Sequence, residues 1–356
     1  MTNVETTPPV GPETRASNAS NPGDVAGEAA SSKMTKKRKG MIAALVAALV
    51  ILALLFAWYL TNRKPLSALP GLNSTTMPHY DRSLYGATKP LGVAVTPNGD
   101  RVYVTESGGT RLTRVYDRSG KQTGTLKPPA STGVGHLPMY VAINPKTQDV
   151  YVSDRQAAAI YVYDASGKYL RTFAAKGVPG KFAPMGLAFG PDGSLYTTDV
   201  GGADTKSHRV LVFGPDGAFV REIKASGSMS FPNGIVLDSR GNIEVADSNN
   251  GRLLVFDKSG KMLAMINPGV GEGDLGMPRG IAVDDAGRLF VVDTADHMVR
   301  VYRVDKSKVM PTYIGSFGDE GQLDGTFEYP NGVATDKRAR VYITDRENNR
   351  VQVWGY

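Results

Sequence analysis

The feature that most constrains this chain is a six-fold repeat. Aligned on a proline, six stretches begin at Pro90, Pro138, Pro184, Pro232, Pro278 and Pro330, with spacings of 48, 46, 48, 46 and 52 residues. Each stretch alternates short runs of β-branched and aromatic residues with turns rich in Gly, Pro, Asp and Asn. A period of this length with strand-type content is typical of repeated β units such as propeller blades.

Each unit reads as three or four short strands. The first follows the proline, at Leu91–Val95, Met139–Ile143, Met185–Phe189, Asn233–Leu237, Arg279–Val283 and Asn331–Thr335. The second is followed by an acid, namely Glu106, Asp154, Asp199, Asp247, Asp293 or Asp345. The third ends in an aromatic residue, and most units add an outer strand. Six such units predict an all-β, six-bladed propeller of four-stranded blades over residues 78–356.

The last unit contains only three strands before Tyr356. A short segment with strand-like character lies ahead of the first proline, around Tyr80–Tyr85. We expect a strand near residues 79–86 to complete the last blade, because this pairing closes the ring and removes an exposed edge.

The N-terminal part has a different composition. Residues 1–40 are poor in hydrophobic residues and end in a basic cluster, so we expect a disordered tail. Residues 41–60 contain no charge and end close to Trp58 and Tyr59. Twenty helical residues span ~30 Å, so this stretch predicts one transmembrane helix. Residues 61–77 read as a linker.

The flanking charges predict the orientation of this helix. Five Lys or Arg residues precede it between Lys33 and Lys39, whereas only Arg63 and Lys64 follow it closely. The excess predicts a cytoplasmic N-terminus and an extracytoplasmic propeller on a single-pass membrane protein. A cleaved signal peptide is the alternative, but the long apolar stretch lacks a good small-residue cleavage site, which favours an uncleaved signal-anchor.

The charge distribution and the cysteine content argue against several classes of function. Much of the formal charge of +7 flanks the apolar stretch, so membrane electrostatics explains it better than nucleic-acid binding does. The chain has no cysteine, which excludes disulfides, cysteine-ligated zinc and thiol catalysis.

The six repeated acids are interpreted as structural. A carboxylate at the same place in every unit is expected to accept hydrogen bonds at a turn, whereas a catalytic residue should break the symmetry. Arg209, Arg252 and Arg350 stand four residues before the closing aromatic and are the expected partners of the acids in three blades.

Positions that differ between units are better candidates for function. The residue after each proline should lie at the mouth of the central channel, and these residues are Leu91, Met139, Met185, Asn233, Arg279 and Asn331. Three are apolar and three polar. A ligand with an anionic or carbonyl group is expected against Arg279, with Asn233 and Asn331 as orienting donors and Met139 and Met185 on the apolar side. The alternative is that these residues only line a water-filled channel.

The stretches PNGVATDKRARVYITDRENNRVQVW and FPNGIVLDSRGNIEVADSNNGRLLVFDKSG resemble the NHL repeat family. This resemblance covers about residues 78–356 and implies a six-bladed propeller without implying one activity. Pro232-Asn233-Gly234 is similar to a metal-binding motif of the gluconolactonase group. Arg279 stands where that group has an acidic ligand, so a divalent cation in the channel is disfavoured and no cofactor is predicted.

Two further candidates complete the sequence interpretation. His136, close to Pro138, would be a single general base of the kind that the resemblance to streptogramin lyases implies, or a plain loop residue. One histidine cannot form the three-histidine zinc site of the amidating lyases. The acidic loop 318–328 is read as a solvated loop, with calcium binding as the alternative.

These observations favour a membrane-anchored binding or scaffold module for a protein or a small molecule. One alternative is a lactonase, lyase or hydrolase at the channel mouth, although no complete catalytic or metal-binding set is visible. A second is an RNA-binding propeller, which the predicted topology and the modest charge of the repeats disfavour.

Overall fold

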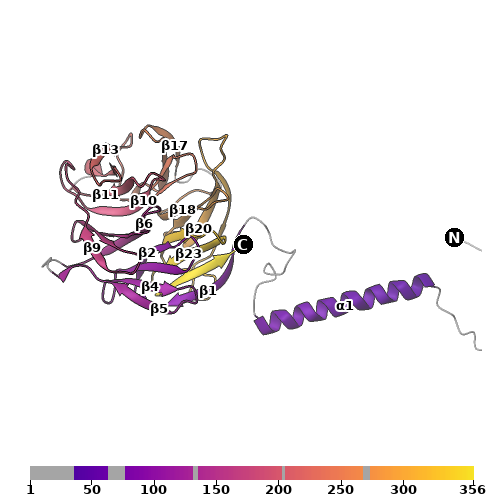
Figure 1. Ribbon diagram of the computed structural model, residues 1–356. Helices are drawn as coiled ribbons and strands as arrows, with labels where there is room; N and C mark the ends of the chain where they lie inside the picture. The colour runs from indigo at the N-terminus through magenta and orange to yellow at the C-terminus, as the bar shows by residue number, and fades with distance from the viewer. Residues whose placement is uncertain (1–35, 63–76, 131–134, 203–204, 268–272) are drawn as a thin grey trace, which may run out of the picture. The chain divides into compact units, whose positions relative to one another are not determined.

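The computed structural model describes residues 36–62, 77–130, 135–202, 205–267 and 273–356 (Figure 1). The chain divides into two compact units, Met1–Lys64 and Pro65–Tyr356. Nearly all of the predicted N-terminal tail and linker lies outside the described residues, so these two assignments stay predictions.

The first unit contains one helix, α1 (Lys36–Asn62), of 27 residues. It includes the whole predicted span 41–60, because the stretch is rich in Ala, Leu and Ile and has no proline. Several of its apolar side chains are exposed, among them Met41 (67%), Leu49 (57%) and Leu54 (65%). Among the described residues, no helix meets both the length and the hydropathy that a membrane crossing requires. The transmembrane assignment therefore stays a prediction.

The second unit is a ring of six four-stranded antiparallel sheets, the blades, numbered here in chain order. Blades 1 and 2 contain β2 (Pro90–Val95), β3 (Arg101–Glu106), β4 (Thr113–Asp117), β5 (Gln122–Leu126), β6 (Pro138–Ile143), β7 (Val150–Asp154), β8 (Ala159–Tyr163) and β9 (Tyr169–Thr172). Blades 3 and 4 contain β10 (Pro184–Phe189), β11 (Leu195–Asp199), β12 (Arg209–Phe213), β13 (Phe219–Ile223), β14 (Pro232–Leu237), β15 (Ile243–Asp247), β16 (Arg252–Phe256) and β17 (Met262–Ile266). Blades 5 and 6 contain β18 (Pro278–Val283), β19 (Arg288–Asp293), β20 (Met298–Arg303), β21 (Thr312–Phe317), β22 (Pro330–Thr335), β23 (Arg340–Asp345), β24 (Arg350–Gly355) and β1 (His79–Tyr85).

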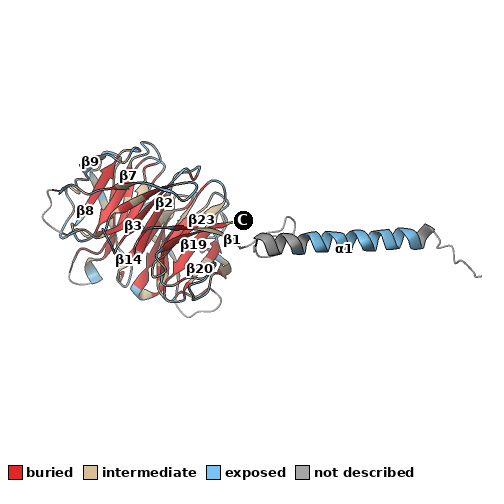
Figure 2. Ribbon diagram, turned by 90° about the horizontal axis from the view of Figure 1, so that it is seen from below, coloured by how far each residue is buried: buried red, intermediate tan, exposed pale blue. Residues whose placement is uncertain are grey.

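The core of the propeller lies between neighbouring blades. The second and third strands are buried on both faces, whereas outer strands such as β9 are largely exposed (Figure 2). One interblade cluster joins Tyr103 and Leu126 of blade 1 to Val141 and Tyr163 of blade 2. The aromatic residues that end the third strands are all buried in such clusters. Each blade therefore buries its faces only when its neighbours are present.

The innermost strands approach one another very closely around the axis. Five of them have glycine two residues after the proline, namely Gly92, Gly186, Gly234, Gly280 and Gly332. A Cβ on Gly332 would lie 2.4 Å from the carbonyl oxygen of Leu91 in the next blade, and the other four would meet similar backbone clashes. Blade 2 departs from this pattern, because Tyr140 occupies the corresponding position.

A ring of hydroxyl groups links these inner strands. In blade 1, Thr105 accepts the N–H of Gly92 (2.7 Å) and donates to the carbonyl of Met139 in blade 2 (2.8 Å). Ser153, Thr198 and Thr344 make the equivalent pair of bonds in blades 2, 3 and 6. The strand register shifts after the proline in all six blades, and in these four the hydroxyl bonds the backbone at the irregularity.

Blades 4 and 5 have Ala246 and Val292 at the hydroxyl position. The bridge is made instead by Ser248 and Thr294, two residues later, which donate to the carbonyls of Pro278 and Pro330. All six joints between blades are therefore bridged by a buried hydroxyl.

Blade 6 is completed by the N-terminal strand β1, which pairs antiparallel with the C-terminal strand β24 (Figure 1). The register pairs His79 with Gly355 and Tyr85 with Arg350. Tyr80 packs edge-to-face on Trp354, with ring centroids 6.1 Å apart. The strand lies within the segment 79–86 that the sequence analysis assigns to ring closure.

Candidate functional site

The six repeated acids lie at the ends of the second strands, and all are at most 1% exposed. Each accepts a backbone N–H from the loop that leads into its own inner strand. The donors are Thr88, Leu137, Ala183, Ser230, Met277 and Glu328. The acids Glu106, Asp154, Asp199, Asp247, Asp293 and Asp345 thus fix the six loops at one end of the ring.

Arginines from the third strands contact most of these acids. The three pairs expected from the sequence are present, with N···O distances of 3.0 Å for Arg209–Asp199 and 2.7 Å for both Arg252–Asp247 and Arg350–Asp345. Two further arginines come two residues later along their strands, on the same face. These are Arg114, 2.7 Å from Glu106, and Arg300, 4.0 Å from Asp293.

The distance between arginine and acid determines the direction in which the pKa of the acid is shifted. Burial would raise the pKa of Glu106, but hydrogen bonds from Arg114, Thr110 and Thr88 outweigh it and hold the pKa below its ordinary value. Burial raises the pKa of Asp293, and the more distant Arg300 does not offset this. The longer glutamate side chain compensates for the shifted arginine in blade 1, whereas the aspartate of blade 5 cannot.

Blade 2 has no arginine at the corresponding places, since Ala159 begins its third strand. His136, from the loop before β6, contacts the acid instead, with Nδ1 2.8 Å from Oδ2 of Asp154. The imidazole also packs edge-to-face on Tyr161. The structure therefore places the candidate base His136 in a His–Asp pair at the acid of its own blade.

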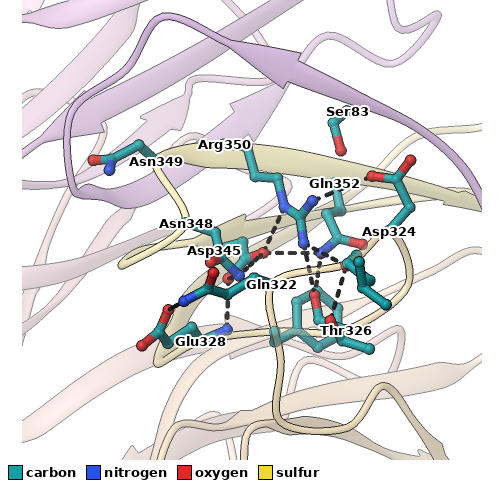
Figure 3. A network of polar contacts seen from close by, with 12 residues as sticks. Ser83, Gln322, Asp324, Thr326, Glu328, Asp345, Asn348, Asn349, Arg350 and Gln352 are labelled. Carbon is teal, nitrogen blue, oxygen red and sulfur yellow. Dashed lines mark hydrogen bonds and ion pairs between the residues drawn. The ribbon is translucent and has the colours of Figure 1, made fainter.

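Figure 3 shows the acid of blade 6 bound to the acidic loop 318–328. Arg350 donates to Asp345 (2.7 Å) and to Asp324 (3.2 Å), and also to the carbonyls of Leu323 and Thr326. Gln352 bonds to the same loop and acid. The loop is thus anchored on blade 6. Within the described ranges, no cluster of three or more His, Asp or Glu side chains could hold a metal ion.

The apolar half of the channel mouth is filled by its own side chains. Leu91, Met139 and Met185 are 5%, 7% and 2% exposed and pack together with Tyr140 and Val200. We call these five residues the apolar plug. Because they are buried against one another, Met139 and Met185 present little surface to a ligand in this conformation.

The polar half is also occupied by internal contacts. Asn233 donates to the carbonyl of Phe231 (3.0 Å) and to Oγ of Ser248 (2.6 Å). Asn331 donates to the carbonyl of Leu91 (3.1 Å) and accepts from Nη1 of Arg279 (3.0 Å). The two asparagines are 4% and 1% exposed. Their amide groups brace the ring, and Arg279 is the more accessible of the three polar residues.

Tyr140 extends the asymmetry of the channel. It belongs to blade 2, opposite blade 5 in a ring of six, yet its phenol lies near Arg279 and Asn331. Burial raises the pKa of Tyr140, and these two side chains oppose the rise. The inner strands line an open hollow of about 270 Å³ with residues such as Val93, Leu187 and Val333. Tyr140 lines this hollow and also belongs to the apolar plug.

Four features of the site were not predicted from the sequence, namely Tyr140, Arg114, Arg300 and the bridging hydroxyls. A signal for Tyr140 exists in the repeat, since it replaces a glycine that the other five units keep. In four units a hydroxyl also stands directly before the acid, but its acceptor lies in the next blade, 32–35 residues away in three of them and 253 residues away in blade 6.

Comparisons with known proteins agree with this architecture. A family model described as NHL repeat matches residues 229–256, 275–302 and 327–354, which are the first three strands of blades 4, 5 and 6. A search of curated proteins finds no match.

Similar solved structures include a streptogramin B lyase, which is 14% identical with a TM-score of 0.54 over 80% of this chain and 99% of the other. A gluconolactonase from Xanthomonas campestris is 18% identical with a TM-score of 0.58 over 77% and 88%. A chain of a nidogen/laminin complex is 18% identical with a TM-score of 0.55 over 70% and 85%. At these identities the likeness concerns the fold. The chain is a six-bladed β-propeller that carries NHL repeats in its last three blades.

Proposed function

We propose that the protein is a membrane-anchored binding module that uses the channel-mouth face of its propeller. The observation that carries this proposal is the contrast, at that face, between buried residues that hold the loops and exposed residues that vary. Every blade has a buried acid that holds the loop before its inner strand and a buried hydroxyl that bridges to the next blade, whereas the exposed residues on the loops differ. A rigid frame with varied loops is the usual basis of a recognition surface.

The exposed residues of this face are unlike one another. Arg111 and Arg155 lie beyond the second strands of blades 1 and 2, and Lys181 and Tyr329 precede the inner strands of blades 3 and 6. Among the described residues, no carboxylate lies at ion-pair distance from Arg111, Arg155 or Lys181. The same holds for Arg279. This charge supports an acidic protein segment or a small anion as the ligand, and the proposal uses no cofactor.

A photo-cross-linking amino acid placed in the full-length protein tests the proposed face. We expect ligand cross-links from position 329, where Tyr329 is 47% exposed, and not from position 170, where Leu170 is 45% exposed on the outer strand β9. Mass spectrometry then identifies the captured species as protein, small molecule or RNA. Equal capture from both positions, or capture from position 170 alone, would contradict the proposal.

Membrane anchoring through α1, with residues 61–356 extracytoplasmic, is part of the proposal. It rests on the uncharged stretch 41–60 and on the basic cluster ahead of it. Protease added to intact cells should release the propeller, and the N-terminus should remain protected. Recovery of the intact chain in the soluble fraction would refute it.

A catalytic role is the second candidate, and the His136–Asp154 pair favours it. A carboxylate that orients an imidazole is a common arrangement for a general base, and His136 breaks the symmetry of the ring. Turnover of simple lactones that disappears in His136→Gln would support this function. An unchanged rate in that variant would exclude His136 as the base.

A further inference from the structure

A second hollow lies on the channel-mouth face, beside the apolar plug rather than within it. It has a volume of about 440 Å³ and is formed by the loops of blades 2 and 3. Its walls come from Leu137, Arg155 and Gln156 on one side and from Lys181–Ala183 and Val200–Gly202 on the other. Small-molecule sites commonly have volumes of ~300–1,000 Å³, so a compact organic ligand fits.

The base of this cavity is apolar and continuous with the plug. Val200 is 6% exposed and belongs to the plug itself. Leu137 and Ala183 are partly buried against the same cluster. A hydrophobic ligand body placed here would gain contacts with side chains that Met139 and Met185 already hold in position.

Two cations, Arg155 and Lys181, stand at the exposed rim of the cavity. The nearest framework acids are already engaged, because Asp154 contacts His136 and Asp199 contacts Arg209. In the described part of the chain, no carboxylate lies within ion-pair distance of either cation. The cavity thus combines an apolar base with positive charge that the protein does not neutralise.

Arg155 is also oriented before any ligand arrives. Its guanidinium lies 5.1 Å from the ring centroid of Phe231, which belongs to blade 4, so the side chain reaches across blade 3. Phe231 adopts a left-handed backbone conformation (φ 51°) ahead of Pro232, and its N–H donates to Nδ1 of His208 (3.0 Å). This conformation is unfavourable for a bulky residue before proline and persists only where the surroundings enforce it.

We infer that this cavity binds a small organic monocarboxylate with an apolar body. The carboxylate lies between Arg155 and Lys181, and the body rests on Leu137, Phe182 and Val200. Arg155 can bind a carboxylate with two parallel hydrogen bonds, and Lys181 and the amide of Gln156 add further donors at the same rim. The inference rests on the proposed use of the channel-mouth face and specifies one ligand class for it.

Calorimetry on the full-length protein in lipid nanodiscs tests this inference. The probes are 2-naphthoate, the neutral 2-naphthamide and 2-naphthyl phosphate, with empty nanodiscs as the blank. We expect saturable binding of the naphthoate, at least tenfold weaker binding of the amide, and no advantage for the phosphate. Tighter binding of the phosphate would replace the carboxylate by a phosphate ester as the ligand class and overturn the inference as stated.

The decisive variant is Arg155→Gln combined with Lys181→Gln. It should weaken naphthoate binding at least tenfold and leave naphthamide binding unchanged. The matched control, Lys121→Gln with Lys168→Gln, removes two exposed cations from turns between outer strands and should change neither.

Equal affinity for naphthoate and naphthamide, absence of binding, or indifference to the Arg155/Lys181 variant would each overturn the inference. If cross-linking from position 329 persists in those cases, the proposed binding face still stands. Loss of that cross-linking as well would contradict both the carboxylate inference and the proposed binding face.

Discussion

Glu244 occupies, in blade 4, a position that the other five blades give to an aromatic ring. The equivalents are Tyr103, Tyr151, Tyr196, Phe290 and Tyr342. Glu244 is 0% exposed, and among the described residues neither carboxylate oxygen has a hydrogen-bond partner. In blade 6 the phenol of Tyr342 donates to Asp336 (3.0 Å), whereas Glu244 faces the equivalent acid, Asp238, with a second carboxyl group.

This environment makes the stability of the propeller depend on pH. Burial raises the pKa of Glu244 to about 8 from an ordinary value of 4.5; Asp238 adds to the rise and Arg240 opposes it. Below pH 4.5 the group is protonated in both the folded and the unfolded chain. Between these values the unfolded chain releases the proton and the folded chain keeps it, so rising pH favours unfolding. At ~1.4 kcal/mol per pH unit, the whole interval corresponds to about 5 kcal/mol.

Glu244→Gln removes this dependence because the amide does not ionise. The free energy of unfolding of the variant, relative to the original protein, should increase by about 4 kcal/mol between pH 5 and pH 8. Any cost of burying the amide lowers the free energy of unfolding by the same amount at every pH. The dependence on pH is therefore unaffected. Urea unfolding of residues 65–356, followed by the fluorescence of Trp354, measures it at each pH.

The control for this experiment is Glu320→Gln, which removes an exposed carboxylate and should give a flat difference across the same pH range. A flat difference for Glu244→Gln as well would show that Glu244 ionises in the folded protein at its ordinary pKa. The reasoning from burial would then be wrong.

Three substitutions test the ring itself by the same urea measurement. Tyr140→Ala should cost about 3–5 kcal/mol, because it removes a buried ring from the apolar plug; a cost below 1 kcal/mol would mean that the neighbouring strands collapse into the vacated space. Thr344→Val should cost about 1–3 kcal/mol, since the N–H of Gly332 and the carbonyl of Leu91 lose their hydroxyl partner, and an unchanged stability would argue against the hydroxyl bridge. Arg350→Gln should cost about 3–5 kcal/mol by leaving the charge of Asp345 buried without its cation, and a loss below 1 kcal/mol would contradict this role of the guanidinium.

The architecture could be predicted because each repeat carries its own turn and strand pattern. The proline spacing fixes the number of blades, and the incomplete last unit identifies β1 as the closing strand. Arg209, Arg252 and Arg350 could be matched to acids because they stand directly opposite them across a strand pair. Arg114 and Arg300 are displaced by two residues, so a search at fixed spacing does not find them.

The candidate site was less predictable because it depends on contacts between blades. Asn233 and Asn331 each follow the proline at the start of an inner strand, as the repeat predicts. That place does not reveal whether an amide faces solvent or bonds to the neighbouring strand. The partner of Asn331 is Leu91, 240 residues away. The cavity beside the plug is likewise formed by the loops of two blades, and its Arg155 contacts a phenylalanine from a third.

The pairing of β1 with β24 has a consequence for synthesis on the ribosome. Tyr85 and Arg350, which are partners in the finished sheet, are separated by 265 residues. At roughly 5–20 residues per second, β1 waits on the order of 10–50 s before its partner exists. During that time the edge of β1 is open to pairing with other chains, and the apolar face of blade 1 that packs on blade 6 is uncovered. The exposure lasts until β24 (Arg350–Gly355) has been translated, so a ribosome that stalls within β24 leaves the ring open.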